Sequence, residues 1–398
     1  MLVRDRAPYF LLQLLISINS AFAIDLSESA GPEFRYFPSH SATENTHHSN
    51  FSFYLEPNFR YKPSNESIVE VQPFGRFDEH DEHRTHGDLR EAYYEQRFDK
   101  FRVKIGVSRE NWGVASSYHV IHIINQTDLI EHPVYQRMLG QPMVNLNYGG
   151  AEHEAQLFLL PWFRERPFAG KDARIRLTPR VDNSRPIFES DAENERLDLA
   201  ARYRLETEPL KMGIYHFWGT SRDPSPVLGS TADGEQVILP YYPTIRQAGL
   251  DAKAKIASSW YPKIEWIHRK GQGPSFNALI GGIEYLWSDF KNTGADLLLI
   301  AEYHYGDNGS LVVSPFDNDW FAGFILSLND DRNTQIILGD VFDTKSDTST
   351  PLIGLFLNVA KKCRLEIEYR GLLGSNPGHP LHPLAKDDFL QVVLIFSI

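Results

Sequence analysis

Strand-like segments of this chain occur in pairs joined by very short turns, and each pair is separated from the next by a longer polar loop. The short turns fall near residues 62–65, 99–100, 150–151, 208–209, 291–292, 330–331 and 361–362. The long loops fall near residues 79–87, 112–141, 164–194, 219–245, 307–317, 345–350 and 372–386. Short connections at one rim and long ones at the other are typical of an up-and-down barrel that spans an outer membrane.

Apolar and charged side chains alternate along many of these segments. In residues 363–370, Cys363, Leu365, Ile367 and Tyr369 alternate with four charged residues. Successive side chains of a strand point to opposite faces, so such a strand has one apolar and one ionic face. In a soluble sandwich the apolar face packs inward, whereas in a membrane barrel it contacts lipid and the charges line a lumen.

Counting the segments predicts an all-β fold, namely a transmembrane antiparallel up-and-down β-barrel of about eighteen strands, with a range of 16–18. The strands are expected near residues 32–38, 50–62, 66–78, 88–98, 101–111, 142–150, 153–163, 195–207, 210–218, 246–258, 261–270, 274–289, 294–306, 318–329, 333–344, 351–360, 363–371 and 387–398. The weak first strand is included because bacterial barrels have an even number of strands. We expect residues 24–398 to form one domain.

The first 23 residues are predicted to be a secretory signal peptide. Arg4 and Arg6 precede an apolar core, and residues 21–23 (Ala-Phe-Ala) have the small-x-small form of a cleavage site. That core is too short to span a bilayer as a helix, and no later apolar run reaches 18 residues. Removing it takes the net charge from −12 to −13, because the segment carries +1. A net acidic exported chain is a poor candidate for binding nucleic acid.

The last segment of the chain alternates apolar residues up to its end. Leu390, Val392, Leu394, Phe396 and Ile398 share one face of the predicted strand. It resembles the terminal strand that outer-membrane barrels present to the barrel-assembly machinery, although such strands usually end in an aromatic residue. A chain that stops within a strand leaves an exposed edge unless that edge pairs with the first strand, so we expect closure.

Aromatic pairs at the predicted strand ends indicate girdles at the two membrane interfaces. The alternative explanation is the ordinary strand propensity of aromatic residues. The pairs are Phe59 and Tyr61, Trp162 and Phe163, Phe217 and Trp218, Trp260 and Tyr261, Trp287 and Phe290, and Tyr303 and Tyr305.

The charged residues that alternate with apolar ones are candidates for lining the pore. They mix both signs, so facing groups would set a field across the lumen. The candidates are Arg102, Lys104, Arg202, Arg204, Lys253, Lys255, Glu265, Glu284, Glu302, Arg364, Glu366 and Glu368.

The loop near residues 112–141 is too apolar to lie free on a surface. We expect it to fold into the barrel mouth and narrow the pore; the alternative is a loop packed against its neighbours outside the lumen. The candidate constriction residues are Trp112, Tyr118, His119, Asn125 and Asp128.

A block of about forty residues resembles a recurring block of alginate-export-type porins and of related, largely uncharacterised outer-membrane barrel families. It comprises residues 89–94 (LREAYY), 105–106 (IG), 112–113 (WG) and 125–129 (NQTDL). The resemblance implies a monomeric outer-membrane barrel that conducts solutes, and it implies no particular substrate. Alginate exporters are expected to have a strongly cationic lumen, and the mixed charges here depart from that pattern.

Three other features of the sequence bear on possible binding or catalytic chemistry. Residues 164–186 carry seven basic against three acidic residues, which indicates either an anion-attracting patch or a loop paired with acidic neighbours such as Glu189, Asp191 and Glu193. The histidine-rich residues 78–88 match no closed zinc site, so no metal is expected. No Gly-x-Ser-x-Gly elbow is present, and His304, which alternates with Glu302, is expected in the lumen rather than in a catalytic group.

These patterns predict a porin-like channel for passive passage of small hydrophilic solutes across a bacterial outer membrane, with no cofactor and no enzymatic activity. Its expected partners are outer-membrane lipid, the barrel-assembly machinery, and the solutes. The alternatives are an outer-membrane barrel enzyme, such as a hydrolase, and a non-conducting structural or binding barrel.

Overall fold

The computed structural model describes residues 25–40, 47–131, 136–307, 313–346, 348–371, 373 and 379–397. The predicted signal peptide and Ile398 lie outside these residues. Among the described residues, no helix is long and apolar enough to span a membrane.

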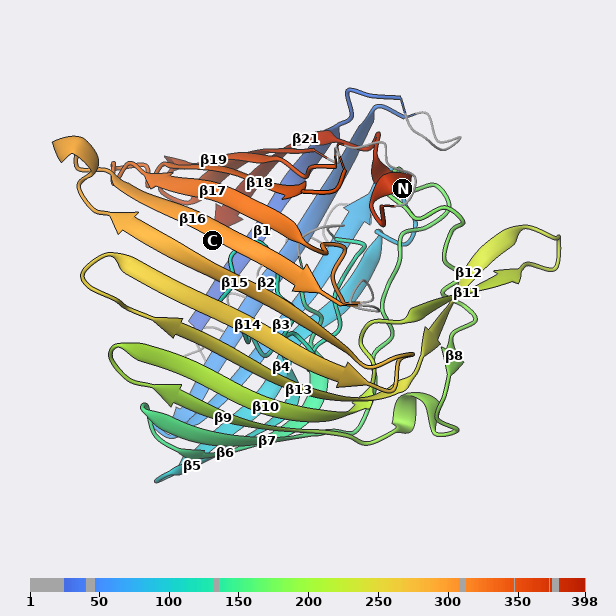
Figure 1. Cartoon of the computed structure of the whole chain (residues 1–398), viewed down its shortest axis with the longest axis horizontal. Coiled ribbons are helices and arrows are strands. Elements are labelled where there is room, and N and C mark those ends of the chain that lie inside the picture. Colours follow the sequence, from blue (N-terminus) through green and yellow to red (C-terminus); the bar gives the residue numbers. More distant parts are fainter. Residues whose placement is uncertain are drawn as a thin grey trace, which may run out of the picture.

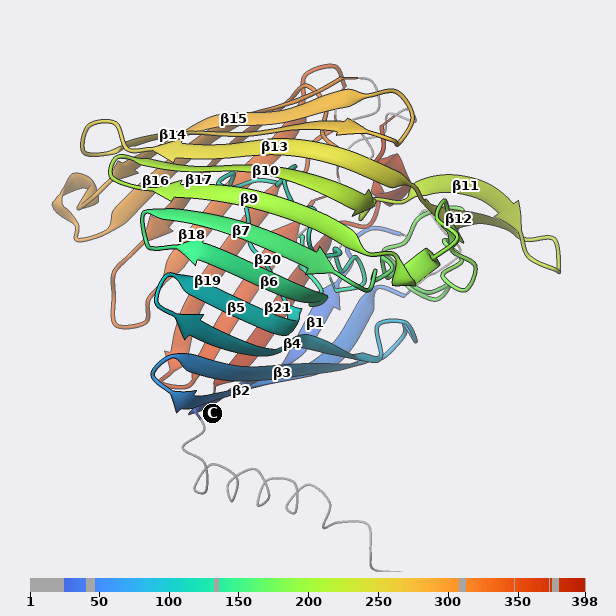
Figure 2. The ribbon, with the colours of Figure 1, turned by 90° about the horizontal axis from the view of Figure 1, so that it is seen from below.

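Eighteen antiparallel strands form one closed sheet, as the sequence predicted. Each strand pairs with the next along the chain, and β21 pairs with β1, which closes the barrel (Figures 1 and 2). The barrel strands are β1 (Asp25–Tyr36), β2 (Ser49–Ser64), β3 (Ser67–Asp78), β4 (His86–Phe98), β5 (Phe101–Ser108), β6 (Gln141–Gly149), β7 (His153–Leu160), β9 (Asp198–Glu206), β10 (Leu210–Thr220), β13 (Thr244–Ala254), β14 (Trp260–Lys270), β15 (Phe276–Trp287), β16 (Asp296–Gly306), β17 (Asp319–Ser327), β18 (Gln335–Asp343), β19 (Leu352–Ala360), β20 (Cys363–Arg370) and β21 (Phe389–Ser397).

The long loops gather at one rim of the barrel and the short turns at the other, as the loop lengths predicted (Figure 1). The loop rim carries structure that the sequence analysis missed. Strands β11 (Ser225–Ser230) and β12 (Gln236–Tyr242) form a hairpin that projects beyond this rim, and β12 pairs in parallel with β8 (Ile187–Phe188) (Figure 2). Two short 3-10 turns, η1 (Glu193–Glu195) and η4 (His382–Leu384), belong to the long loops, and a third, η2 (Phe290–Asn292), lies in the short turn between β15 and β16 at the other rim.

The two faces of the strands are arranged as in a membrane barrel. On β9, Asp198, Ala200 and Arg202 are buried inside, whereas Tyr203 and the preceding Leu197 are exposed outside. Large exposed apolar side chains recur around the outer wall, among them Phe53 on β2, Ile283 on β15 and Leu338 on β18. The outer surface is therefore apolar, and most buried charges belong to the interior.

The aromatic girdle needs a correction. Trp162 and Trp218 are 45% and 42% exposed on the outer surface, but their neighbours Phe163 and Phe217 are fully buried. Adjacent residues in extended chain point to opposite sides, so both members of such a pair cannot reach lipid. Phe217 lies in the barrel interior, and Phe163 packs against Tyr242 at the loop rim.

Glycines let side chains lie flat on part of the inner wall. A Cβ atom added to Gly339 would lie 2.8 Å from the ring of Phe321, and one added to Gly354 would lie 2.5 Å from the ring of Phe356. Any side chain at position 339 or 354 would collide with the neighbouring phenylalanine ring. Glycine at these positions lets each ring pack against the backbone.

Candidate functional site

The candidate site is the barrel lumen with the segment that crosses it, of which residues 109–131 and 136–140 are described and which we name the inner loop. This segment connects β5 to β6 and runs inside the barrel wall (Figures 1 and 2). Its backbone and side chains bond to inward-facing residues of both β14–β16 and β1–β4.

Most of the predicted pore-lining residues belong to barrel strands and share the inward face. Lys255 differs, because it follows the end of β13 and lies exposed in the turn at the opposite rim. The inward-facing candidates are Arg102, Lys104, Arg202, Arg204, Lys253, Glu265, Glu284, Glu302, Arg364, Glu366 and Glu368.

Three of these residues, Glu265, Glu284 and Glu302, hold the inner loop, and we name them the clamp carboxylates. Oε1 of Glu265 accepts hydrogen bonds from the backbone N–H of Val114 at 2.7 Å and of Ala115 at 2.9 Å. Glu265 Oε2 accepts one from the N–H of Val120 at 3.1 Å, and Nδ1 of His119 lies 2.8 Å from Oε1. One fully buried carboxylate thus satisfies several donors of a segment that has no strand partner.

Glu302 binds the next turn of the same segment. Its Oε1 accepts a hydrogen bond from the N–H of Ser116 at 2.7 Å, and its Oε2 accepts one from the N–H of Ser117 at 2.9 Å. The Ser117 hydroxyl also donates to Glu302. Because β14 and β16 are separated by β15, the two glutamates hold a stretch of loop across three strands.

Lys263 supplies the positive charge at this wall. Its Nζ lies 2.6 Å from Oε1 of Glu284, 2.5 Å from Oε1 of Glu302 and 2.6 Å from the hydroxyl of Ser116. Lys253 lies 2.6 Å from the other oxygen of Glu284. Buried carboxylates are tolerable only when they are paired and hydrogen-bonded, and these two lysines supply the positive charge for Glu284 and Glu302.

The far end of the inner loop is bound to the opposite wall. Glu131 is bound by the guanidinium of Arg76, with an Nη2–Oε2 distance of 2.7 Å, and Arg76 also contacts Glu33 at 3.1 Å. Burial raises the pKa of Glu131, but the positive charges of Arg76 and Arg84 outweigh it and keep that pKa below its ordinary value.

Asp128, one of the predicted constriction residues, pairs with Arg90 of β4 at 2.9 Å. Its other oxygen accepts hydrogen bonds from the backbone N–H of Ile130 and Glu131. The inner loop is therefore bound at both walls and crosses the lumen between them.

Apolar side chains of the inner loop fill the remaining contact with the wall. Trp112, Ile121, Ile123 and Ile124 are almost fully buried in one cluster. The wall residues of that cluster include Met143, Phe158, Leu160, Tyr215, Phe217, Ile245, Ile267, Phe276 and Ile280. The alternation of the strands predicts an inner face lined by charged residues. The structure corrects this prediction, because the inner face is apolar where the inner loop covers it.

The other predicted constriction residues hold the loop in shape. Asn125 donates to the carbonyl oxygens of Ser108 and Leu139, which ties the two ends of the loop together. The Tyr118 hydroxyl donates to the carbonyl oxygen of Val313 at 3.2 Å. His119 stacks on His122, and burial together with the nearby His119 lowers the pKa of His122 to about 4.

Below the inner loop, towards the turns, the wall is divided into a charged and an apolar part. Glu154 bridges Arg102 at 2.7 Å and Arg204 at 3.1 Å on the β5–β9 side. On β16–β19 the inward residues are instead mainly apolar or glycine, including Leu298, Ile300, Phe321, Gly323, Ile325, Ile337, Gly339, Gly354 and Phe356. Charged side chains therefore line only part of the lumen at this level of the barrel.

Ser117, His304 and Glu302 are the nearest approach to a catalytic group. Nε2 of His304 lies 2.8 Å from the Ser117 hydroxyl. The carboxylate of Glu302 bonds to the serine rather than to the imidazole, and Nδ1 of His304 is buried without a hydrogen-bond partner among the described residues. In a serine–histidine–acid triad the carboxylate accepts a hydrogen bond from the imidazole. That contact is missing here, so these three residues do not form a catalytic triad.

In the described part of the chain, no group of three or more histidine, cysteine, aspartate or glutamate residues is arranged to hold a metal ion. In the histidine-rich segment, Asp78 pairs with Arg84 at 2.5 Å, and Asp81 accepts hydrogen bonds from the backbone N–H of His83 and Gly170.

The basic residues of segment 164–186 are mostly paired, with partners other than the three acidic neighbours considered from the sequence. Arg164 pairs with Asp88, Arg166 with Asp223, Arg174 with Asp387, Arg180 with Glu235 and Arg185 with Asp182. The first of these pairs connects this loop to β4 and the next two connect it to other loops, so their partners are far away along the chain.

Sequence reasoning missed Lys263, Arg76 and Glu131. Lys263 alternates with Glu265 in the strand predicted at 261–270, so the rule that selected Glu265 could have selected it as well. Glu131 lies in a loop with no period, and no local signal distinguishes it from a solvated acid.

No family model matches the sequence, and no curated protein matches it. Solved structures match over most of the chain. One is Wzi of Escherichia coli, described as an outer-membrane protein involved in group 1 capsule assembly and a carbohydrate-binding β-barrel (TM-score 0.53, 12% identity, 100% of this chain and 89% of that chain). The chain has the fold of a porin-type outer-membrane barrel.

Two other similar barrels are OccAB4 of Acinetobacter baumannii and OccD3 of Pseudomonas aeruginosa. OccAB4 has a TM-score of 0.52 at 10% identity and is matched over 94% of this chain and 98% of its own. OccD3 has a TM-score of 0.52 at 9% identity and is matched over 94% and 91%. At these identities the similarity shows a shared fold and nothing about substrates.

Proposed function

We propose that this barrel is a porin-like channel of a bacterial outer membrane, through which small hydrophilic solutes pass passively and in which the inner loop sets the size limit. The observation that carries the proposal is the inner loop, bound at β14–β16 by the clamp carboxylates and at β3–β4 by Arg76 and Arg90. An eighteen-stranded barrel is wide enough for an aqueous channel unless a segment narrows it.

The outer surface and the closure of the barrel support the proposed partners and location. The apolar outer wall fits a lipid bilayer, and the long loops would face the outside. The closing strand β21 is the element that the barrel-assembly machinery would receive. The block resembling alginate-export-type porins supports a solute-conducting barrel, and the division of the lumen into charged and apolar parts gives no support to polyanion export.

The test is single-channel recording in planar bilayers with three proteins. Wild type should show small, steady conductance steps. A double variant Glu265→Gln, Glu302→Gln keeps side-chain shape but weakens the bonds to the loop, so its steps should be larger or fluctuate. Glu66→Gln, in the exposed turn between β2 and β3, is the matched control and should behave as wild type.

A fourth protein makes the outcome decisive. Replacing residues 113–138 with a short Gly-Ser linker removes the inner loop and should give conductance well above wild type. If this variant folds as a barrel and still passes no current, the channel proposal is wrong.

The second candidate is a non-conducting binding barrel. The same inner loop favours it, because its contacts with both walls are buried and extensive, and the similar Wzi barrel is described as carbohydrate-binding. Silent wild-type protein alongside a conducting loop-deleted variant would support this candidate. A hydrolase is disfavoured by the Ser117–His304–Glu302 geometry, and ester-hydrolysis assays on the folded barrel should show no activity.

A further inference from the structure

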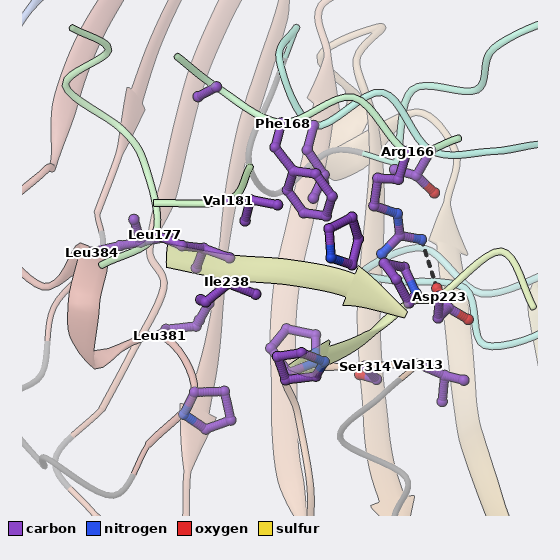
Figure 3. A pocket seen from close by; sticks show the side chains of 18 of the residues that line it. Arg166, Phe168, Leu177, Val181, Asp223, Ile238, Val313, Ser314, Leu381 and Leu384 are labelled. Atoms are coloured by element: carbon purple, nitrogen blue, oxygen red, sulfur yellow. Dashed lines mark hydrogen bonds and ion pairs between the residues drawn. The ribbon is translucent and has the colours of Figure 1, made fainter. Parts of the chain in front are cut away.

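A cavity of about 310 Å³ lies among the loops at the loop rim, and we name it the mouth pocket (Figure 3). Its size is at the lower end of the range of about 300–1,000 Å³ that small-molecule sites occupy. Its walls come from segments that are far apart in the sequence, represented by Phe168, Val181, Ile238, Phe316 and Leu384. All of these side chains are apolar, and each except Ile238 is at most 9% exposed.

Five prolines strengthen the apolar character of the mouth pocket. Proline has no backbone N–H, so a wall rich in proline offers few donors to a polar ligand. Its fixed φ also makes the wall rigid, which lowers the entropy lost on binding. These residues are Pro224, Pro226, Pro240, Pro315 and Pro380.

The charged residues that line the mouth pocket are two arginines and one aspartate. Arg166 and Asp223 form an ion pair at 2.6 Å at one end, with Leu177 and Leu384 toward the other (Figure 3). Asp223 also pairs with the fully buried Arg269 at 3.0 Å, so its charge is already satisfied. The net charge of the lining is therefore positive, although the whole chain carries −12.

Arg176 is the other arginine of the lining, and its charge acts at longer range on the carboxylates of Glu235 and Asp387. No hydrogen bond or ion pair links it to any described residue, and its Nε is buried without a hydrogen-bond partner. An anionic group beside Arg176 would form charge-assisted hydrogen bonds, which are the stronger kind.

The inner loop forms the floor of the mouth pocket. Tyr118, Thr127, Leu129 and Gln136 belong to it and line the cavity. Tyr118 is held there by its hydrogen bond to Val313 and by an edge-on contact with the ring of Phe316. A bound molecule would thus lie directly above the segment that crosses the lumen.

We propose that the mouth pocket binds a small organic anion with a planar apolar body, with the anionic group at Arg176 and the apolar body against the proline-rich wall. This inference does not depend on whether the barrel conducts. Binding and conduction are measured separately, so failure of one proposal leaves the other standing.

The probe is naphthalene-2-sulfonate, which is an anion throughout the usable pH range, and its neutral counterpart is naphthalene-2-sulfonamide. Binding is measured by isothermal titration calorimetry on the full barrel in lipid nanodiscs, with empty nanodiscs as the blank. The sulfonate should bind saturably at one site and about ten-fold more tightly than the sulfonamide, since charged hydrogen bonds are the difference.

Three variants locate the site. Arg176→Gln should weaken sulfonate binding about ten-fold and leave sulfonamide binding unchanged. Arg185→Gln, in the same loop but outside the lining, should bind as wild type. Val181→Trp should fill the cavity and abolish binding of both probes, and heat-modifiable migration on gels verifies that each variant is folded.

The proposal is overturned if wild type shows no saturable heat with the sulfonate. It is equally overturned if Arg176→Gln and Arg185→Gln bind alike, or if folded Val181→Trp retains wild-type affinity. If wild type binds the two probes with equal affinity, the pocket does not recognise the anionic group and the proposal is wrong.

Discussion

At the scale of single residues, the clamp depends on Lys263. Its side chain is 2% exposed and contacts two of the clamp carboxylates at once. Removing one partner of a buried ion pair leaves an uncompensated buried charge, which costs far more than losing an exposed pair. Lys211 offers the comparison, because it also pairs with a glutamate, Glu206, but is 62% exposed near the turns.

Lys263→Met should therefore lower the free energy of unfolding by about 3–5 kcal/mol, because Glu284 and Glu302 lose a shared cation. Lys211→Met should change it by about 0–1 kcal/mol, because exposed pairs contribute little. Urea unfolding of the barrel in lipid vesicles measures both. Similar values for the two variants would show that the clamp does not depend on Lys263.

His122 provides a pH-dependent prediction at the same scale. The pKa of His122 is about 4 in the folded barrel, against about 6.5 for an unfolded chain. Between these values the unfolded state binds more protons, so this contribution to stability is complete above pH 6.5 and is lost as the pH falls towards 4.

The difference in unfolding free energy between pH 7.5 and pH 4.5 should thus be larger for wild type than for His122→Gln. Glutamine keeps a donor for the carbonyl oxygen of Trp112, which His122 contacts at 2.6 Å, and cannot titrate. An equal difference in the two proteins would show that His122 is not a source of acid sensitivity.

At the scale of elements, the alternation of each strand decides which residues meet lipid. Leu299 on β16 is 42% exposed on the outer wall and pairs with Phe324. Ile325 on β17 pairs with Leu298 at a similar level of the barrel, but on the inner face. Two neighbouring apolar residues thus occupy opposite environments, although nothing in their side-chain chemistry distinguishes them.

Leu299→Arg should reduce barrel stability by about 2 kcal/mol or more, since a charge would then face acyl chains. Ile325→Arg should cost much less, because the guanidinium would enter the lumen. The folded fraction after refolding into vesicles, read from heat-modifiable migration, compares the two. A greater loss of folded protein for Ile325→Arg than for Leu299→Arg would contradict the inward and outward faces assigned to β16 and β17.

Alternation predicted the facing of residues such as Arg202, Glu265 and Glu302 because the direction of a side chain in a strand is a local property. It did not predict the path of the inner loop, whose contacts join residues about 150 positions apart, such as Ala115 and Glu265. It also failed for Phe163, which was paired with Trp162 although adjacent residues point apart. Alternation does not predict the hairpin β11–β12, because its strands contain proline and glycine, which are typical of loops.

At the scale of the whole molecule, stability depends on closure between β1 and β21. Their pairing extends from Tyr36 with Leu390 to Ser29 with Ser397. In lipid an unpaired strand edge would leave its backbone N–H and C=O groups without partners, so an open sheet is not viable there. The hairpin β11–β12 belongs to a separate sheet, so closure of the barrel does not depend on it.

A chain truncated after Asp388 should therefore fail to form a heat-modifiable barrel. A chain in which residues 230–236 at the hairpin tip are replaced by Asn-Gly should form one normally. Refolding into vesicles and proteolysis of the product measure both. Assembly of the truncated chain would show that β21 is dispensable for closure.

The number of strands, their closure and the direction of most side chains were determined by the sequence alone, because a two-residue period and the length of each connection are local properties of a chain. The tertiary structure decided which carboxylates hold the inner loop, which arginines receive its far end, and that Arg176 is left without a partner among the described residues. Such pairings depend on which strands meet across a lumen, and no local pattern encodes the geometry of an enclosed space.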